Sequence, residues 1–399
     1  MKKQILKIKR LFTLTILLFP IISSAQNPHI TDIINHISAD SIRRNVEDLE
    51  NFTTRFAFAD NNKDVALYLK DRMEYYGFEV ILDSFYEENC AVWKDNLFFQ
   101  GWQYNVCCLK KSDIPLQKDS SLILGAHYDC ISNIDDFKDY LHFAPGADDN
   151  ASGVACLLEL ARVWNKTQVN HKYNLRIEFF ANEEQTLAGS NARMHSISKT
   201  HNVGILAMVN LDMVGFDSTN TVCLNYYDNS EWLTELAKNN TSLYTDLNLN
   251  LSQEFIERSD SWCFYSWGVT SLFITENDFS PYYHSLQDSS VYLNYPYMKK
   301  ITALTLSIAY DILNNYPKVD INQPIIPIVS FIYDNNSLNL TFATAQDKII
   351  TLTDTFGRII YKKNTKNQSI TIPINHLKNS MYILSITTSN SKITRKFIK

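Results

Sequence analysis

The sequence predicts an α/β domain, in which helices cover both sides of a mostly parallel sheet, followed by a small all-β domain. Two observations carry this prediction. Short, largely apolar runs such as 122–124 and 205–211 alternate with helical stretches such as 153–164. Strands of this kind are typical of parallel sheets buried on both faces. After residue 316, short alternating runs separated by Asn, Asp, Gly and Lys indicate strands alone.

The helices and strands of the first domain are expected in a simple order. Apolar residues at three-and-four spacing indicate helices within 42–49 and 63–76, and Gly77 ends the second of these. An alternating strand is expected at 78–82, and the helix 153–164 has apolar residues along one face. The remaining strands are expected at 122–124, 175–180, 205–211 and 269–274.

The N-terminal residues predict export. Residues 1–25 combine five Lys and Arg with an apolar run at 11–22 and small residues up to Ala25, which is typical of a cleaved secretory signal. The apolar run is short for a membrane span, and Pro20 interrupts it. The formal net charge is −6 and becomes more negative once these basic residues are removed, which argues against binding to nucleic acid or an anionic membrane.

Five short segments carry residues that can bind a hard divalent metal. Three of them follow predicted strands, at the edge where an open α/β sheet gathers its ligands. Five of the ten glycines lie in or beside these segments, which indicates close backbone packing. The segments are GAHYD (125–129), PGADDNASG (145–153), NEE (182–184), NLDMVG (210–215) and YYHS (282–285). The candidate ligands are His127, Asp148, Glu184, Asp212 and His284.

These residue types suit a pair of zinc ions. Zinc binds His nitrogen and carboxylate oxygen, and two ions roughly 3.5 to 4 Å apart can hold a nucleophilic water between them. Glu183, next to the candidate ligand Glu184, could take a proton from that water and return it to the leaving amine of a cleaved peptide. His127 and Asp129 form an H-x-D pair, in which we expect Asp129 to orient the imidazole of the ligand. Glu183 and Asp129 are therefore the candidate catalytic residues.

Residues from about 40 to 313 resemble the secreted co-catalytic di-zinc aminopeptidases, the leucyl-aminopeptidase-like metallopeptidases, whose motifs occur here in the same order and spacing. The resemblance implies a mixed, mainly parallel sheet between helices, two zinc ions per chain and peptide N-termini as substrate. It also implies a cis peptide after the bridging ligand, here Asp148–Asp149. It assigns one zinc to His127, Asp148 and Asp212, and the other to Asp148, Glu184 and His284.

The substrate side of the site departs from the family pattern. A family segment that usually has Ser-Asp-His is here Ser259-Asp260-Ser261, so the contact made by that His is in doubt. The resemblance makes Ser259 a candidate support for His284, and Asp260 a further candidate in the same segment. Tyr283 precedes the ligand His284, as in many family members, and is a candidate substrate contact. The preferred side chain at the cleaved residue stays open.

The C-terminal residues resemble a type IX secretion sorting domain, of the kind typical of the phylum Bacteroidetes. The resemblance rests on LTDTFGRIIYKK (352–363), HLKNSMYILSI (376–386) and KFIK (396–399), with Ser380 in place of a usual Gly. It implies passage through the secretion machinery, followed by release or attachment at the cell surface. We therefore expect a signal peptide at 1–25, a di-zinc peptidase domain at 26–316, a proline-marked linker at 317–330 and a β-sandwich sorting domain at 331–399.

Three other functions stay open on the sequence. A glutaminyl cyclase has the same fold with one zinc and shares the His-x-Asp and Glu-Glu segments, although the stretch 149–153 resembles the peptidases more closely. A carboxypeptidase of the same superfamily would use the same ligands. A catalytically inactive relative that serves as a binding protein is disfavoured, because none of the family's metal ligands is missing.

Overall fold

The structure is a computed structural model of the 399-residue chain. The predicted signal peptide and residues 317–327 of the predicted linker lie outside the residues that it describes. The described residues are 26–91, 97–114, 119–132, 140–199, 203–315, 328–333, 336–342, 345, 347–355, 357–378, 380–388 and 392–398.

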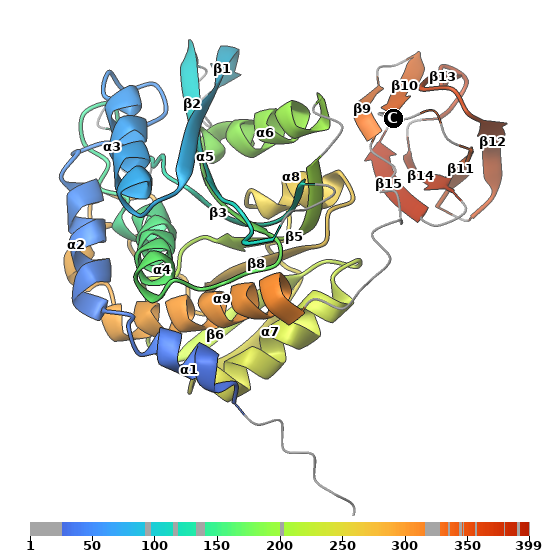
Figure 1. The fold of residues 1–399 in the computed structure, drawn as a ribbon. Coiled ribbons are helices and arrows are strands. Elements are labelled where there is room, and N and C mark those ends of the chain that lie inside the picture. The colour runs from blue at the N-terminus through green and yellow to red at the C-terminus, as the bar shows by residue number, and fades with distance from the viewer. Residues whose placement is uncertain are drawn as a thin grey trace, which may run out of the picture.

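Helices and strands alternate through residues 28–315 (Figure 1). The helices are α1 (Pro28–Ile34), α2 (Ala39–Glu50), α3 (Asn62–Tyr75), α4 (Gly153–Thr167), α5 (Glu183–Thr186), α6 (Ala188–Lys199), α7 (Glu231–Tyr244), α8 (Ser261–Ser266) and α9 (Tyr295–Asn315), with the short helical segments η1 (Ala147–Ser152) and η2 (Ser290–Tyr292). The strands are β1 (Glu79–Ala91), β2 (Phe98–Lys110), β3 (Asp119–His127), β4 (Asn174–Phe180), β5 (Val203–Leu211), β6 (Thr221–Tyr226), β7 (Asn248–Ser252) and β8 (Ser271–Glu276).

These eight strands form one mixed sheet in the order β1-β2-β4-β3-β5-β8-β6-β7. The four central strands, β4, β3, β5 and β8, are parallel to one another. Antiparallel pairings occur toward the edges, where β2 joins β1 and β4 and where β6 joins β8. The predicted mainly parallel sheet is confirmed, because the apolar runs of the sequence correspond to its parallel centre.

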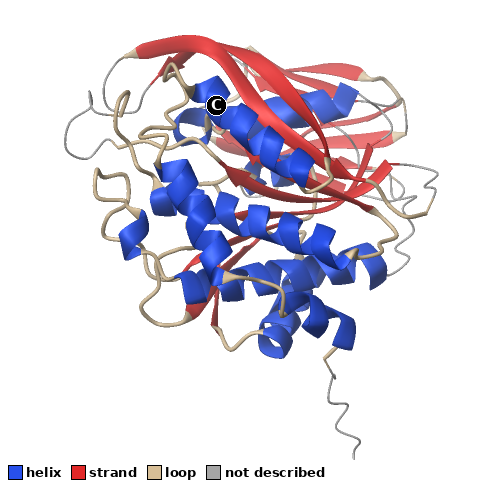
Figure 2. Ribbon diagram, turned by 60° about the vertical axis from the view of Figure 1, so that its left-hand side comes forward, coloured by secondary structure: helices blue, strands red, loops and turns tan. Residues whose placement is uncertain are grey.

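Both faces of the sheet are buried, because successive residues of the central strands enter different cores. In β3, Leu122 and Leu124 belong to the main core with residues of α2, α4 and α9, whereas Ile123 belongs to a second core with residues of α6 and α8. In β5, Val209 and Met208 divide between the same two cores. Figure 2 shows the helices packed alongside the strands. This double burial explains why the strands are apolar throughout.

The expected helices are present with small shifts at their ends. The stretch 42–49 lies within α2, which begins after Ser38, whose hydroxyl accepts a hydrogen bond from the backbone N–H of Ser41. The stretches 63–76 and 153–164 correspond to α3 and α4. The sequence did not single out β2, β6 or β7, in which polar residues such as Asn or Gln interrupt the apolar ones.

Residues 328–398 form two antiparallel sheets of their own. One has the order β13-β10-β9, with β9 (Ile328–Tyr333), β10 (Ser337–Phe342) and β13 (Ser369–Pro373). The other has the order β12-β11-β14-β15, with β11 (Lys348–Asp354), β12 (Ile359–Thr365), β14 (Met381–Thr387) and β15 (Lys392–Ile398). Alternate residues such as Leu338, Leu340, Leu384 and Ile386 form one core shared by the two sheets. The predicted all-β sandwich is confirmed.

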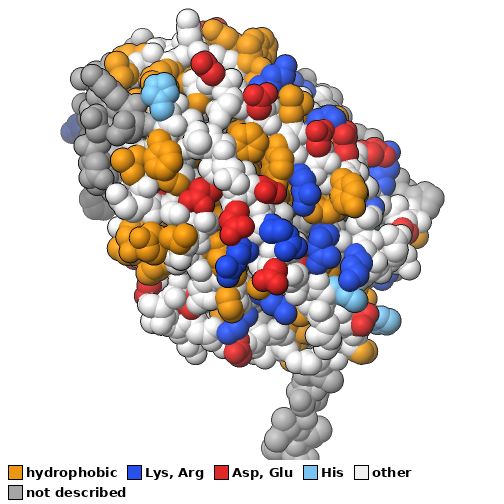
Figure 3. Space-filling model, turned by 90° about the vertical axis from the view of Figure 1, so that its left-hand side faces the viewer, with side chains coloured by type: hydrophobic (Ala, Val, Ile, Leu, Met, Phe, Trp, Pro, Cys, Tyr) orange, Lys and Arg blue, Asp and Glu red, His pale blue; other side chains and the backbone are white. Residues whose placement is uncertain are grey.

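Two further features concern the helices and one face of the surface. Among the described residues, no helix combines the length and the apolar character that crossing a membrane requires. On the face that carries α2 and α3, Lys and Arg side chains are interspersed with Asp and Glu (Figure 3). This face therefore offers no continuous basic surface.

A buried ion pair joins α6 to the sheet, and its contribution to the stability of the fold can be tested. Arg193 donates to both carboxylate oxygens of Glu178, on β4, at 2.9 and 2.8 Å, and also contacts Asp83 at 3.1 Å. Glu178 has no exposed surface. Removing the arginine leaves this carboxylate desolvated and without a counter-charge.

We predict that Arg193→Met lowers the free energy of unfolding by about 3–5 kcal/mol, because it isolates the charge of Glu178. The double variant E178M/R193M should recover most of that loss, since it removes both charges and keeps the volume. Urea unfolding followed by circular dichroism measures both. A double variant no more stable than R193M would show that the ion pair is not the cause.

Candidate metal centre

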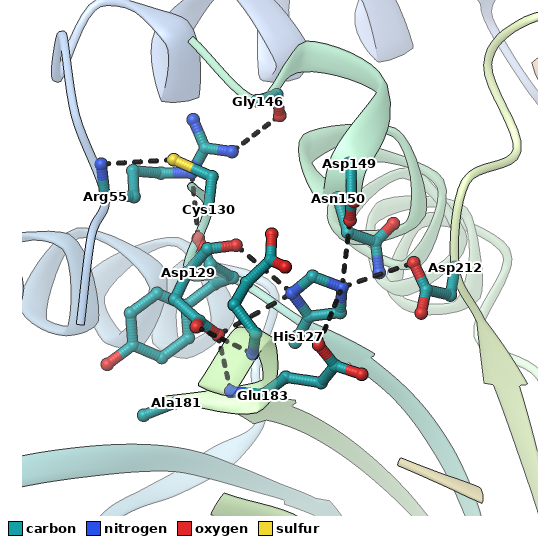
Figure 4. Close-up of polar contacts among 12 residues, drawn as sticks. Arg55, His127, Asp129, Cys130, Gly146, Asp149, Asn150, Ala181, Glu183 and Asp212 are labelled. Carbon is teal, nitrogen blue, oxygen red and sulfur yellow. Dashed lines mark hydrogen bonds and ion pairs between the residues drawn. The ribbon is translucent and has the colours of Figure 1, made fainter. Parts of the chain in front are cut away.

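The candidate ligands lie at the carboxyl ends of the parallel strands. His127 is the last residue of β3, Glu184 follows β4, and Asp212 follows β5. Asp149 comes from η1, between β3 and α4, and His284 from the loop after β8. Because β4, β3, β5 and β8 are neighbours in the sheet, their ends converge at one place, where His127, Asp149 and Asp212 meet from separate elements (Figure 4).

The donor atoms form two groups that share one residue. In the first group, Nε2 of His127 lies 3.2 Å from Oδ1 of Asp149 and 3.2 Å from Oδ1 of Asp212. In the second group, Nε2 of His284 lies 3.1 Å from Oδ2 of Asp149 and 2.8 Å from Oε2 of Glu184. Within each group the donor atoms lie within 4.8 Å of one another. Asp149 therefore contributes one oxygen to each group.

The prediction that Asp148 joins the two groups is wrong, because its carboxyl group points away from both. Its Oδ1 accepts a hydrogen bond from the backbone N–H of Gly215 at 2.9 Å, and the carboxyl group neighbours that of Glu276. The cis peptide likewise lies one residue later than predicted, between Asp149 and Asn150. Two adjacent aspartates give the same sequence pattern, and only the backbone geometry decides which of them faces the histidines.

The backbone around Asp149 is held by another buried carboxylate. Oδ1 and Oδ2 of Asp288 accept hydrogen bonds from the N–H groups of Asp148 and Asp149, at 2.9 and 3.1 Å. Gly146, just before this segment, has a left-handed φ of 53°. A Cβ there would lie 2.3 Å from Cβ of Cys130 and 2.6 Å from the carbonyl oxygen of Asp149, so only glycine fits. The orientation of Asp149 is thus fixed by its neighbours.

A buried arginine that no sequence pattern singles out connects the two loops behind the site. Arg55 is 1% exposed and donates to the carbonyl oxygens of Tyr128 at 2.8 Å, Pro145 at 2.7 Å and Gly146 at 2.6 Å (Figure 4). Tyr128 follows His127, and Gly146 precedes the segment that carries Asp149. A single guanidinium therefore fixes the spacing of two loops that carry candidate ligands. A lone arginine in a loop has no motif that could have revealed this.

Asp129 joins the first histidine to the turn after β4. Its Oδ1 and Oδ2 accept hydrogen bonds from the backbone N–H groups of Glu183 at 3.0 Å and Glu184 at 3.3 Å. Oδ1 also lies 3.6 Å from Nδ1 of His127, on the side of the ring away from Asp149. This is the location from which a carboxylate can orient the imidazole and the glutamates together.

The segment 259–261 contacts the site through its serine rather than through a substrate group. Oγ of Ser259 donates to Oδ2 of Asp212 at 2.5 Å. Ser259 therefore supports Asp212, whereas the sequence had suggested that it supports His284. Asp260 is fully buried outside the two groups, and burial raises its pKa to about 7. Ser261, in place of the family's His, is buried and hydrogen bonds to the hydroxyl of Tyr227 at 2.8 Å.

Burial of several acids and two histidines at one place shifts the pKa values of the site. Burial raises the pKa of Glu184 to about 7 and that of Glu183 well above its usual range. Burial alone would lower the pKa of both histidines, but the neighbouring acids, led by Asp212, together outweigh it for His127 and raise that pKa well above the ordinary value. Glu184 and Asp149 together raise the pKa of His284 to about 10.

The chemistry of the donor set fits two zinc ions. Oε1 of Glu184 is buried and accepts no hydrogen bond from any described residue. Such an oxygen is stabilised by a bound cation, and imidazole nitrogen with carboxylate oxygen is a set that zinc prefers. Each group offers one imidazole and two carboxylates, which leaves open positions for water or substrate.

A cavity of about 610 Å³ opens beside these residues. Glu183, Asp149, Asp212 and His284 line it on one side. Tyr283, a candidate substrate contact, also lines it, with its ring stacked on His284 at 3.7 Å between centroids. The volume is in the usual range for sites that hold a small ligand or the end of a peptide.

Two comparisons identify the class of protein. Residues 105–309, about half of the chain, match the model of peptidase family M28, and the chain belongs to this family of metallo-aminopeptidases. Residues 334–399 match the secretion system C-terminal sorting domain, which indicates a protein that is secreted or held at the cell surface. Both family resemblances predicted from the sequence are confirmed, while the bounds of the signal peptide and linker remain predictions.

Individual relatives agree with this family. Leucine aminopeptidase 1 of Coccidioides posadasii is 27% identical over 297 residues, which cover 70% of this chain and 72% of the relative. A zinc aminopeptidase from Bacillus subtilis has the same fold, with a TM-score of 0.58, 16% identity, and coverage of 70% of this chain and 96% of that one. A Bacteroides thetaiotaomicron glutaminyl cyclase bound to N-acetylhistamine also shares the fold, with a TM-score of 0.55, 20% identity, and coverage of 69% and 98%.

The shared position of Asp149 leads to a direct test by metal analysis. We predict that Asp149→Asn loses most zinc from both groups, because one carboxylate faces both histidines. Asp148→Asn should retain zinc. The amide oxygen of the new side chain can accept from the N–H of Gly215, and its N–H can donate to the neighbouring Glu276. Zinc per folded chain, measured by elemental analysis, distinguishes the two. Loss of zinc from D148N alone would return the bridging role to Asp148.

Proposed function

We propose that this chain is a two-zinc aminopeptidase that removes N-terminal residues from peptides and proteins outside the cell. The observation that carries the proposal is the pair of donor groups that share Asp149, with Glu183 beside them. His127, Asp149 and Asp212 would hold one ion, and Asp149, Glu184 and His284 the other. Two zinc ions in such a site supply a Lewis acid for a carbonyl and lower the pKa of water.

Glu183 is the residue suited to move the proton. Its Oε2 lies 4.0 Å from Nε2 of His127, yet the residue belongs to neither donor group. It lines the cavity, and its backbone N–H is held by Asp129. Because burial raises its pKa, it is a stronger base than a solvated carboxylate, and it can accept a proton from water and return it to the leaving amine.

The acidic lining supports a substrate with a free amine. Glu183 and Glu257 line the cavity and belong to neither donor group, so they keep their charge when zinc offsets the ligands and can attract an α-ammonium group. This favours an aminopeptidase over a carboxypeptidase of the same family. The glutaminyl cyclase shares the fold, so the fold does not separate the two activities. Two complete donor groups favour the two-zinc peptidase over a single-zinc cyclase.

We predict that Glu183→Gln retains both zinc ions but loses kcat by roughly a hundredfold or more, because the amide cannot accept the proton. Elemental analysis and steady-state kinetics on an aminoacyl chromogenic amide measure the two properties. Glu254→Gln is the matched control, since Glu254 is exposed and does not line the cavity. An unchanged kcat in E183Q would remove Glu183 as the base.

The requirement for a free amine gives an independent test of the reaction. We predict cleavage of aminoacyl amides with an unblocked amine and no cleavage of the same substrates after N-acetylation. Peptides blocked at the amine but free at the C-terminus distinguish a carboxypeptidase. Glutaminyl peptides distinguish a cyclase, which would release ammonia without breaking the peptide bond. Hydrolysis of the acetylated amides at a similar rate would contradict the proposal.

A further inference from the structure

The cavity has an apolar floor and a charged rim. Met213, Phe273 and Thr275 line it and are each at most 5% exposed. Glu257 and Arg258 line it from exposed positions, in the loop between β7 and α8. Among the described residues that line the cavity, Arg258 is the only lysine or arginine, against five carboxylates.

Both ends of the loop that carries Arg258 are attached to the candidate metal centre. On one side, Phe255 contacts Phe279 with centroids 5.6 Å apart, and Phe279 contacts Tyr283 at 5.1 Å. Tyr283 in turn stacks on His284. On the other side, Ser259 is hydrogen bonded to Asp212. A hydrogen bond of 2.9 Å from the N–H of Arg258 to the carbonyl oxygen of Phe255 closes the turn between these attachments. The backbone of Arg258 is therefore fixed beside the cavity.

The guanidinium group of Arg258 is available to a ligand. No described residue forms an ion pair or hydrogen bond with it, and its neighbour Glu257 is likewise without one. Arginine presents several N–H donors in a planar fork that matches the two oxygens of a carboxylate. Arg258 is therefore suited to bind a carboxylate at the rim of the cavity.

Given the proposed aminopeptidase reaction, two features determine which part of a peptide substrate Arg258 contacts. The floor formed by Met213 and Phe273 is apolar and buried, so it suits an apolar side chain on the N-terminal residue and would disfavour a carboxylate. The rest of the peptide has to leave through the open rim, where Arg258 lies. Arg258 therefore faces groups that follow the scissile bond.

We propose that Arg258 binds a carboxylate of the substrate on the far side of the scissile bond, and so gives this enzyme a preference for anionic groups there. Two sources supply that chemistry. One is the side chain of an acidic second residue, and the other is the terminal carboxylate of a dipeptide. The inference rests on the proposed aminopeptidase function and assigns part of its specificity.

The experiment uses the full zinc-loaded chain and two matched substrate pairs. Leu-Glu-amide against Leu-Gln-amide tests the side chain, and Leu-Ala against Leu-Ala-amide tests the terminal carboxylate. For at least one pair, we expect wild-type kcat/KM to favour the anionic member by roughly two- to fivefold, mainly through KM, as for an exposed ion pair. Arg258→Gln should abolish that preference, and 0.5 M salt should weaken it in the wild type. Arg44→Gln, an exposed arginine of α2 outside the cavity, should keep it.

The outcomes separate this inference from the proposed function. A preference that R258Q removes in one pair supports the inference and names the source of the carboxylate. Equal ratios in wild type and R258Q for both pairs, or a preference that R44Q removes as well, would overturn it. Hydrolysis of the neutral amides by the wild type tests the aminopeptidase activity separately. Failure there would remove the proposed function itself.

Discussion

The site depends on the division of one carboxylate between two histidines. Oδ1 of Asp149 faces His127, and Oδ2 faces His284, although the two histidines lie far apart in the sequence. The surrounding contacts serve to keep that carboxylate in place. Asp288 binds the backbone N–H of Asp149, and the side chain of Asn150 bonds to the backbone of Leu211. The two donor groups therefore form one unit rather than two independent sites.

The same unit concentrates negative charge in a buried region, which a protein without bound cations stabilises poorly. Arg55 supplies a fixed positive charge behind the site, but its hydrogen bonds go to backbone carbonyls and not to the acids. Asp148 and Glu276 are neighbouring carboxyl groups, and burial raises the pKa of both. The acids that face the cavity outnumber the two histidines that pair with them, and divalent cations would offset the remaining charge.

The sequence predicted the fold through its apolar strands and most of the site through its motif order. Asp212 and His284 could be chosen because each is the one suitable residue in its segment, and His127 and Glu184 because the family resemblance assigns them as ligands. Asp148 could not be distinguished from Asp149 in the same way, because the choice depends on a left-handed Gly146 and on hydrogen bonds from distant residues. Contacts of this kind leave no periodic signal, and strands β2, β6 and β7, in which polar and apolar residues are mixed, were missed for a related reason.

The loop 255–259 links specificity to the metal centre through short-range contacts. Its serine holds Asp212 and its phenylalanine reaches His284 through two further rings, so the loop cannot shift without disturbing both donor groups. Once cations offset the buried carboxylates, the remaining charges at the rim are those of Glu257 and Arg258. The backbone of Arg258 is fixed and its guanidinium is a planar fork, so less freedom is lost per hydrogen bond on binding a carboxylate than with a lysine. The loop 255–259 therefore supports both the geometry of the donor groups and the proposed preference for anionic groups that follow the scissile bond.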